Sequence, residues 1–197
     1  MFVSFEGLDG VGKTTQVELL QSALVRDGRD VVATREPGGT PVGERVREIL
    51  LGRDEITPWA EAALFAAARA ELVERVIAPE LGRGGSVISD RYIDSSLAYQ
   101  GIARGLGVER VLELNLHATG GLLPDRTFLL LLDPERAAGR LGEPDRIEQE
   151  GDEFRAAVDR AYRTLVEMFP SRVVPIDASR PPAEVAREIR EQLRDLS

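Results

Sequence analysis

Cysteine, a membrane-length apolar run and a basic charge balance are all missing from this chain of 197 residues. Without cysteine, disulfide bonds and thiolate metal sites are excluded. The sequence shows no signal peptide and no long apolar run, so we expect a cytoplasmic protein that is neither exported nor bound to a membrane. Its formal net charge is -9, which argues against a nucleic-acid partner because such partners require a basic face.

Lysine is almost absent as well. Lys13 is the only lysine, and the other 24 basic residues are arginines. It falls inside the segment Gly7-Leu8-Asp9-Gly10-Val11-Gly12-Lys13-Thr14, which fits the pattern G-x-x-x-x-G-K-[ST]. An ammonium is a compact point charge, whereas a guanidinium is a planar fork. We therefore expect this position to resist replacement by arginine.

The residues on both sides of this segment complete a strand, a loop and a helix. Phe2-Val3-Ser4-Phe5 precedes it, and apolar residues at helical spacing follow it from Val17 to Leu24. Glycines let backbone N–H groups approach a phosphate closely, and the helix N-terminus adds a partial positive charge. Lys13 suits the β- and γ-phosphates of a nucleotide, and the Thr14 hydroxyl can ligate Mg²⁺. Rather than a chance glycine-rich turn, we expect a P-loop whose ATP-binding residues are Gly7, Leu8, Asp9, Gly10, Val11, Gly12, Lys13, Thr14 and Thr15.

Five short runs rich in apolar and β-branched residues alternate with helical patterns along the chain. They span residues 2–6, 30–34, 86–90, 127–132 and 172–176. Apolar runs of this kind are typical of parallel strands, which are covered on both faces and joined by right-handed helical crossovers. The sequence thus predicts an α/β protein with the three-layer P-loop NTPase fold, a five-stranded parallel sheet flanked by helices, in a single domain 1–197.

Polar or loop-forming residues follow these strands at the edge where parallel sheets bind ligands. They are Gly7, Arg35, Asp90, Asp133 and Asp177. Asp90 is suited to hold Mg²⁺ together with Thr14, either directly or through water. Arg91, the next residue, would then face the phosphates. The alternative for this pair is a buried structural ion pair.

A long alanine-rich helix is expected after Thr57-Pro58, which resembles an N-cap followed by a proline at the first helical position. Phe65 and Arg69 lie four residues apart and therefore project from one face of this helix. An aromatic ring and a guanidinium could together hold a flat base. The helical pattern alone favours another interpretation, with Phe65 in the core and Arg69 as a surface charge.

A polar stretch flanked by glycines interrupts the helical pattern after the fourth strand. The segment 141–151 has the composition of a short mobile lid, and Arg140 and Arg146 bracket its first part. Its closure would bring guanidinium groups over the phosphates, whereas a solvated hinge without a catalytic role is the alternative. Asp133 is expected to cap a helix that runs through Arg140. His117, the single histidine, is weak support for a metal site.

The P-loop alone indicates a nucleotide with magnesium and leaves the acceptor of the phosphoryl group open. A GTPase usually reads guanine with an Asn-Lys-x-Asp segment, but this chain has no lysine outside the loop. A motor or transport ATPase is typically larger and carries an acidic base beside its metal-binding aspartate, where this chain has Arg91. A small-molecule kinase needs a second anion site and a lid, and the sequence can supply both.

Five segments, taken in order, carry a resemblance that covers nearly the whole chain. They are Glu6–Thr15, Thr34–Thr40, Phe65–Arg69, Asp90–Gly101 and Asp145–Glu150. In these segments the chain resembles the bacterial thymidylate kinases. The resemblance implies the nucleoside monophosphate kinase fold, Mg²⁺-dependent transfer of the ATP γ-phosphoryl group to dTMP in dTTP biosynthesis, and a homodimer. A broader nucleotide or small-metabolite kinase and a non-catalytic nucleotide-binding module are the alternatives.

The resemblance also implies which residues hold the base and sugar of dTMP. Phe65 would stack on thymine, and Tyr99 would pack beside the deoxyribose, where a 2′-hydroxyl would be crowded. The side chains expected at the polar edge of the base are those of Arg69, Ser96 and Gln100.

The remaining implied roles concern the 3′-hydroxyl and the phosphates. Asp9 would engage the 3′-hydroxyl, and the arginines expected around the acceptor phosphate are Arg35, Arg47 and Arg91. The bacterial members of this family bring arginines from the lid, for which Arg140 and Arg146 are the candidates. Phosphoryl transfer depends on positioning and charge neutralisation rather than on a strong general base. The catalytic residues implied are therefore Lys13, Arg91, Arg140 and Arg146.

Overall fold

A five-stranded parallel β-sheet forms the centre of the computed structural model, which describes residues 1–140 and 145–196. The strands lie in the order β2-β3-β1-β4-β5. Their bounds are β1 (Phe2–Glu6), β2 (Val31–Arg35), β3 (Ser86–Asp90), β4 (Arg126–Leu131) and β5 (Val173–Asp177). Every strand lies within one residue of its predicted range and pairs in parallel with its neighbours, so the predicted α/β fold is confirmed.

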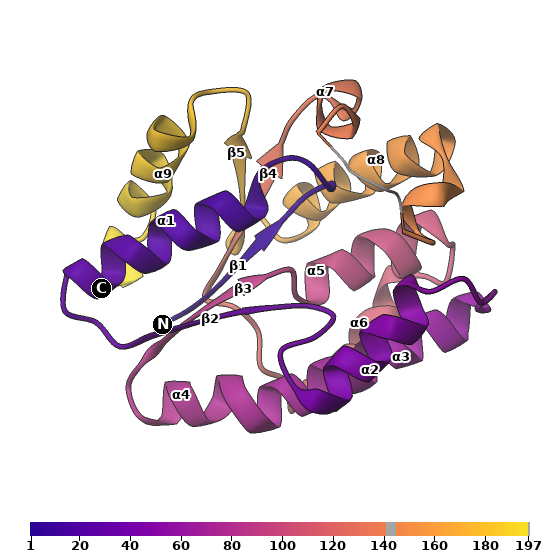
Figure 1. Ribbon diagram of the computed structural model, residues 1–197, viewed down its shortest axis with the longest axis horizontal. Helices are drawn as coiled ribbons and strands as arrows, with labels where there is room; N and C mark the ends of the chain where they lie inside the picture. The colour runs from indigo at the N-terminus through magenta and orange to yellow at the C-terminus, as the bar shows by residue number, and fades with distance from the viewer. Residues whose placement is uncertain (141–144, 197) are drawn as a thin grey trace.

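Helices cover the sheet on two sides. The described α-helices are α1 (Lys13–Arg26), α2 (Pro41–Leu51), α3 (Pro58–Leu72), α4 (Ala78–Gly82), α5 (Ile93–Ser96), α6 (Val108–Thr119), α7 (Pro134–Ala138), α8 (Asp152–Met168) and α9 (Pro182–Glu191). Shorter helical turns of other geometry are η1 (Val73–Ile77), η2 (Leu97–Ala103), η3 (Glu148–Glu150) and η4 (Arg194–Leu196). Figure 1 shows α1 and α9 side by side against one face of the sheet, while α4 and α8 cover the other.

Strands β1, β3 and β4, in the middle of the sheet, are largely buried because both faces are covered there. All five residues of β1, the central strand, are buried, and so are Phe128, Leu129 and Leu130 of β4. Phe5 of β1 packs against Phe128 with 5.5 Å between the ring centroids. This apolar centre fixes the position of the strand ends, where the functional residues lie.

Capping residues precede several helices, and Thr57 and Asp133 are the two that the sequence predicted. Thr40 accepts a hydrogen bond from the Gly43 N–H at 2.9 Å, just before the proline that opens α2. Asp133 accepts from two backbone N–H groups at the start of α7. Thr57 occupies the N-cap position of α3, although its side chain accepts no cap bond. The predicted helix through Arg140 was wrong in its extent, since α7 ends at Ala138 and glycine, a poor helix former, follows.

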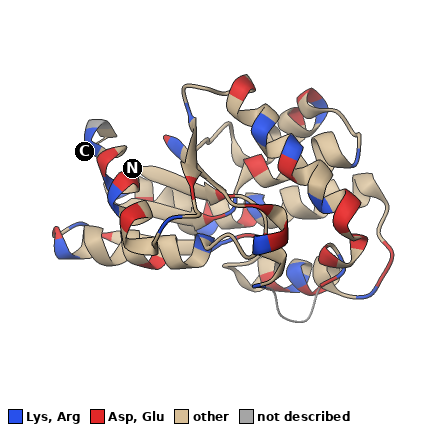
Figure 2. Cartoon of the chain, turned by 90° about the horizontal axis from the view of Figure 1, so that it is seen from above, with Lys and Arg blue, Asp and Glu red and all other residues tan. Residues whose placement is uncertain are grey.

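Among the described residues, no helix is both long and apolar enough to cross a bilayer. Basic and acidic residues are interspersed over the helices (Figure 2). Some of them form ion pairs within one helix, such as Arg163 with Asp159 at 2.8 Å. Such pairs on a helix surface contribute only a few tenths of a kcal/mol.

Candidate active site

The carboxyl ends of β1, β2 and β3 lie next to one another and position the site. Phe5 of β1 and Arg35 of β2 are both in register with Asp90, the last residue of β3. The P-loop, residues 7–14, leaves the end of β1 and leads into α1. The convergence of strand ends expected from the sequence is confirmed for these three strands.

Two glycines of the P-loop make contacts that a side chain would prevent. Gly7 and Gly10 have φ angles of 130° and 82°. A Cβ atom on Gly7 would lie 2.5 Å from the Leu130 carbonyl oxygen, and one on Gly10 would lie 2.1 Å from the Ala137 carbonyl oxygen. The loop therefore packs closely against the end of β4 and against α7, which holds α7 beside the P-loop.

Lys13 is folded back onto the loop. Its Nζ atom donates to the carbonyl oxygens of Leu8 at 2.8 Å and Gly7 at 3.1 Å, and it lies 3.4 Å from Asp9 Oδ1. Only 6% of the side chain is exposed. Burial, and then repulsion from Arg91, lowers the pKa of the ammonium. The Lys13 ammonium is thus bound by two neutral carbonyl oxygens and one carboxylate, and an anion that binds to the loop would compete with them.

A cavity lies beside the P-loop at the carboxyl edge of the sheet, and we call it the phosphate cavity. The predicted ATP-binding residues that line it are Asp9, Gly10, Gly12, Lys13, Thr14 and Thr15. Four arginines line it as well, namely Arg35, Arg47, Arg91 and Arg140. The other predicted residues lie at its margin: Leu8 and Val11 line neighbouring hollows, and Gly7 supplies a backbone oxygen to Lys13.

The two predicted magnesium ligands lie together in the phosphate cavity. Thr14 Oγ1 donates to Asp90 Oδ2 at 2.8 Å. A hydroxyl and a carboxylate are the hard oxygen ligands that Mg²⁺ prefers, and Mg²⁺ usually fills the rest of its shell with waters and substrate phosphates. In the part of the chain that the structure describes, no three carboxylates or histidines surround a common metal position. These donors thus fit a magnesium ion that arrives with a polyphosphate.

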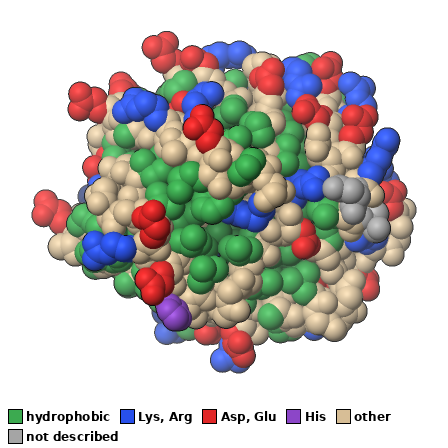
Figure 3. All heavy atoms as spheres, turned by 180° about the vertical axis from the view of Figure 1, so that it is seen from behind, with side chains coloured by type: hydrophobic (Ala, Val, Ile, Leu, Met, Phe, Trp, Pro, Cys, Tyr) green, Lys and Arg blue, Asp and Glu red, His purple; other side chains and the backbone are tan. Residues whose placement is uncertain are grey.

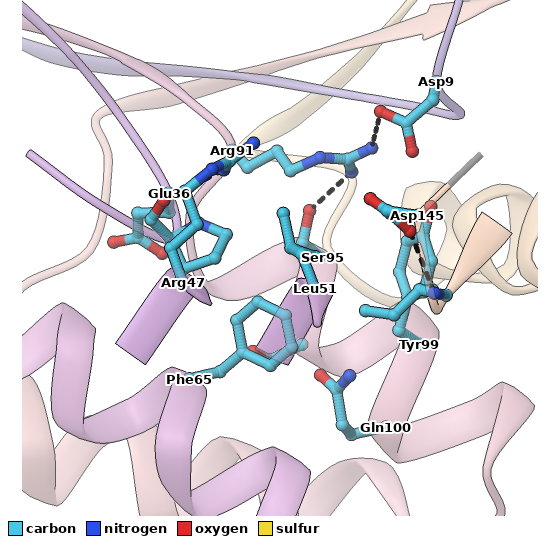
Figure 4. Close-up of a pocket in the computed structure, with 13 residues that line it drawn as sticks. Asp9, Glu36, Arg47, Leu51, Phe65, Arg91, Ser95, Tyr99, Gln100 and Asp145 are labelled. Atoms are coloured by element: carbon cyan, nitrogen blue, oxygen red, sulfur yellow. Dashed lines mark hydrogen bonds and ion pairs between the residues drawn. The ribbon is translucent and has the colours of Figure 1, made fainter. Parts of the chain in front are cut away.

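A second cavity adjoins the first, and we call it the aromatic cavity because Phe65 and Tyr99 form part of its wall. Most of the predicted dTMP-binding residues line it, namely Asp9, Arg47, Phe65, Arg91, Ser96, Tyr99 and Gln100. Figure 4 shows Phe65 from α3 on one side, Tyr99 and Gln100 from η2 opposite, and Arg91 across the top. The dTMP-binding residues that the resemblance implied come from α2, α3, α5, η2, the end of β2 and the segments that follow β1 and β3. Most of them line this one cavity.

Arg91 lies where the two cavities meet. It donates to Asp9 Oδ1 at 2.7 Å, to Ser95 Oγ at 2.9 Å and to the Tyr162 hydroxyl at 3.0 Å. Its φ angle is +71°, in the left-handed region that side chains rarely adopt. Burial alone would raise the pKa of Asp9, but the charges of Arg91 and Lys13 hold it well below its usual range.

Two of the predicted dTMP-binding arginines do not line the aromatic cavity. Arg35 lines only the phosphate cavity and pairs with Glu44 at 2.9 Å. Arg69 is 1% exposed, and its guanidinium donates to Glu36, Ser96, Asn115 and the Tyr92 carbonyl oxygen. A direct contact of Arg69 with the base stays a prediction, and it would require some of these bonds to break.

The two candidate lid arginines occupy different places. Arg140 lines the phosphate cavity, and its Nη1 atom lies 3.3 Å from the Gly10 carbonyl oxygen. Arg146 instead donates to the Leu50 carbonyl oxygen at 2.8 Å and to Glu61 at 2.6 Å. Arg146 is therefore outside the phosphate cavity in this structure, and its part in the transfer stays a prediction.

The lid prediction covers residues 141–151, of which 141–144 lie outside the described residues. In the described part, Asp145 and Ile147 line the aromatic cavity. Ile147 also lines an adjacent hollow with Gly151. This part of the predicted lid thus lines the aromatic cavity, and its closure over the phosphates stays a prediction.

Sequence reasoning missed a buried network behind Arg91. Glu6, at the end of β1, accepts from the Tyr92 N–H at 2.7 Å, from Ser95 Oγ at 2.6 Å and from the Tyr162 hydroxyl at 3.0 Å. Burial, followed by repulsion from Asp94, raises the pKa of Glu6 to about 7. The only sequence signal was an acidic residue inside an apolar strand, which indicates a charge with buried partners.

Two further acidic residues were also missed. Glu36 is buried, lines both cavities and pairs with Arg69 at 2.6 Å. Glu61 is fully buried on α3, one turn before Phe65. A glutamate in an alanine-rich helix gives no sign of burial by itself, because the partners of Glu61 are far away in the sequence.

Comparisons with known proteins agree with the motifs. A family model described as thymidylate kinase matches residues 5–189. A thymidylate kinase from Synechococcus sp. (strain JA-3-3Ab) is 51% identical over 189 residues, which cover 96% of this chain and 93% of that protein. One from Leifsonia xyli subsp. xyli (strain CTCB07) is 52% identical over 195 residues, with 96% and 92% covered. The crystal structure of thymidylate kinase from Ehrlichia chaffeensis is similar, with a TM-score of 0.82, 33% identity and 98% of each chain covered.

Proposed function

The chain belongs to the thymidylate kinase family, and on that premise we propose that it transfers the γ-phosphoryl group of ATP to dTMP, giving dTDP and ADP for dTTP biosynthesis. It is then a nucleoside monophosphate kinase. One observation carries the geometry of the proposal: Asp9, Arg47 and Arg91 line both the phosphate cavity and the aromatic cavity. Two nucleotides bound in the two cavities would meet with their phosphates at these residues.

ATP takes the phosphate cavity in this proposal. The backbone of the P-loop and the start of α1 cradle its phosphates, and Lys13 exchanges its carbonyl partners for phosphate oxygens. Magnesium would be held by Thr14 and Asp90, and it supplies positive charge that neutralises the β- and γ-phosphates. The hydrogen bond between these two side chains keeps both oxygens on the cavity side of the sheet edge.

A hollow next to the P-loop suits the adenine of ATP. It lies beside the start of α1 and is lined by Val11, Gln16, Arg140 and Arg180. Guanidinium groups stack well on flat rings, so Arg140 and Arg180 could hold the base between them. Arg140 lines both this hollow and the phosphate cavity, which is why it can stay with ATP through the transfer.

dTMP takes the aromatic cavity. Phe65 and Tyr99 offer flat apolar surface for the base and the deoxyribose, and Ser96 and Gln100 offer polar groups for the base edge. Arg69 orients Ser96 by a hydrogen bond from behind the cavity wall, with 3.1 Å between Arg69 Nη1 and Ser96 Oγ. Apolar walls with a few polar groups are typical of a site that binds one small ligand selectively.

The acceptor phosphate lies at the junction of the cavities. Arg91 and Arg47 reach it from two elements, and Arg35 contributes its charge from the phosphate side. Asp9 engages the 3′-hydroxyl of dTMP and at the same time holds Arg91 at 2.7 Å. The transition state spreads charge over the equatorial oxygens of the phosphoryl group, so the guanidiniums and Lys13 stabilise it electrostatically.

We also propose that two chains form a homodimer and that the reaction takes place in the cytoplasm, where ATP and dTMP are available. Support for the dimer comes from an apolar area on the rear face of the molecule, next to the single histidine of α6 (Figure 3). Leu112 and Leu116 of α6 are only partly buried in the single chain. Light scattering on the purified chain would test this, and a monomer at micromolar concentration would contradict it.

Turnover with a panel of acceptors tests the proposed function. The protein is incubated with ATP, Mg²⁺ and one acceptor. The acceptors are dTMP and the monophosphates of uridine, cytidine, adenosine and guanosine, each of these four in its ribose and its 2′-deoxyribose form. We expect dTMP to be phosphorylated best. Equal use of another acceptor would favour a broader nucleotide kinase, and nucleotide binding without any turnover would favour a binding module.

A further inference from the structure

The carboxylate of Glu61 gathers four donors in the interior of the protein. Its Oε1 atom accepts from Gln100 Nε2 at 2.8 Å and from Arg104 Nε at 3.1 Å. Its Oε2 atom accepts from Arg104 Nη2 at 3.0 Å and from Arg146 Nη2 at 2.6 Å. Because Glu61 is fully buried, these partners must replace all of the water that the charge would otherwise have.

The two guanidiniums keep this carboxylate ionised. Burial alone would raise the pKa of Glu61, but the hydrogen bonds from Arg104, Arg146 and Gln100 lower it below the usual value. An ionised carboxylate can only accept hydrogen bonds. At neutral pH Glu61 is therefore an acceptor for every group that touches it.

This restriction decides how the Gln100 amide is turned. The two ends of an amide are nearly the same size, and only their partners decide which end is which. Glu61 can take only the NH₂ end, so the carbonyl oxygen of Gln100 must point elsewhere. Figure 4 shows the amide directed into the aromatic cavity, between Phe65 and Tyr99. The cavity is thus offered a hydrogen-bond acceptor at this point.

The pyrimidines differ in what they present to such an acceptor. Thymine and uracil carry an N–H donor at N3, whereas cytosine carries an unprotonated nitrogen there. A carbonyl oxygen that faces N3 accepts a hydrogen bond from thymine or uracil. It is repelled by the lone pair of cytosine N3, and with cytosine the buried carbonyl would stay unpaired. Given the proposed function, in which the base of dTMP lies against Phe65, the N3 edge can face Gln100.

We propose that Glu61 is a positioning residue for base specificity: it fixes the Gln100 amide so that the cavity selects pyrimidines with an N3–H group and rejects cytosine. Glu61 itself lies behind Gln100 and does not line the cavity. It lies on α3 and Gln100 on η2, so the selection depends on the packing of two elements.

The experiment compares kcat/KM for dTMP, dUMP and dCMP in the wild-type protein and in Glu61→Gln. A neutral amide at position 61 can donate as well as accept, so Gln100 can turn either end to the cavity. We expect the preference for dTMP over dCMP to narrow at least about tenfold, while the ratio of dTMP to dUMP stays the same because both bases carry N3–H. An unchanged ratio of dTMP to dCMP in a folded Glu61→Gln protein would overturn the proposal.

Two further variants separate this role from a general structural one. Arg104→Gln removes one guanidinium from Glu61 but leaves the carboxylate an acceptor, so the dTMP to dCMP ratio should be retained. The double variant Glu61→Gln with Gln100→Glu exchanges the two groups and again presents an acceptor to the cavity, so it should restore the ratio. The double variant also keeps one carboxylate near Arg104 and Arg146, so it tests the proposal even if Glu61→Gln alone fails to fold. A double variant that does not restore the ratio of dTMP to dCMP would contradict the proposal.

These outcomes are distinct from a failure of the proposed function. If the wild-type protein does not phosphorylate dTMP, the function itself is wrong. If the wild type prefers dTMP to dCMP and Glu61→Gln leaves the ratio of the two kcat/KM values unchanged, only the proposed role of Glu61 is wrong.

Discussion

Arg91 and Asp9 form an ion pair across the junction of the two cavities, with 2.7 Å between Arg91 Nη2 and Asp9 Oδ1. Arg91 follows β3, and Asp9 belongs to the P-loop that follows β1. The pair therefore ties the ends of the neighbouring strands β1 and β3 together at the point where the phosphates of both substrates are proposed to meet. It also holds the Arg91 guanidinium in place before any substrate arrives, so little reorganisation is needed during the transfer.

Arg91→Lys tests this pair. One ammonium cannot reach Asp9, Ser95 and the Tyr162 hydroxyl with the geometry of a guanidinium. We expect kcat/KM for dTMP to fall about 100-fold, with most of the loss in kcat. Steady-state kinetics measure this, and circular dichroism confirms the fold. A loss confined to KM would mean that Arg91 only binds the ground state.

Substituting the two candidate lid arginines one at a time separates their roles. Arg140 lines the phosphate cavity, whereas Arg146 is bound to Glu61 and Leu50. If the protein reacts with the arginines as the structure places them, Arg140→Met should lower kcat by up to about a thousandfold, and Arg146→Met should mainly raise KM for dTMP. A large fall in kcat for Arg146→Met would instead show that Arg146 leaves Glu61 and reaches the transferring phosphoryl group.

Sequence patterns predicted the sheet and the P-loop closely because both depend on local signals. Apolar runs between helical patterns locate the strands within one residue, and the spacing of glycines before Lys13 locates the loop. The family resemblance then added Phe65, Tyr99 and Gln100, which the structure brings into one cavity.

What the sequence could not show were the partners of buried charges. Arg69 and Glu36 are 33 residues apart in the chain, and Arg146 and Glu61 are 85 apart. A helical pattern marks a charged residue as exposed, unless the fold supplies a counter-charge from another element. The placement of Arg69 under Ser96, and of Arg146 against α3, follows from such partners and could not be predicted from local spacing.

Arg69→Met is expected to destabilise the protein strongly. It removes the counter-charge of Glu36, which is buried and whose pKa burial already raises. Leaving one member of a buried ion pair without its partner costs about 3–5 kcal/mol. Urea unfolding measures this. The double variant Arg69→Met with Glu36→Gln should recover part of the loss, and no recovery would show that the other bonds of Arg69 carry the stability.

Glu6 should make the stability depend on pH between about 4.5 and 7. Burial and Asp94 raise its pKa from 4.5 to about 7, against the opposing effect of Arg91. In the folded protein Glu6 therefore keeps its proton at pH values where the unfolded chain has lost it. Its contribution to stability is complete below pH 4.5 and is lost as the pH rises through 7.

Comparison with Glu6→Gln isolates this contribution, since the amide cannot titrate. We expect the free energy of unfolding of the wild type, relative to the variant, to fall with rising pH across this window by on the order of 1–3 kcal/mol. Chemical unfolding of both proteins at several pH values measures it. Parallel curves for the two proteins would show that Glu6 does not hold a proton in the fold.

Gly10→Ala tests the close approach of the P-loop to α7. A Cβ atom there would lie 2.1 Å from the Ala137 carbonyl oxygen, so α7 would have to move away, and Arg140, two residues beyond its end, would move with it. Gly28→Ala is a matched control, because Gly28 has nearly the same φ angle, 79° against 82°, but no atom within 4 Å of the added carbon. Backbone strain alone costs about 1 kcal/mol in both variants. Gly10→Ala should lose more stability than Gly28→Ala and should also raise KM for ATP, whereas Gly28→Ala should keep its activity. Equal stability losses with unchanged KM in both would mean that α7 can shift without disturbing the phosphate site.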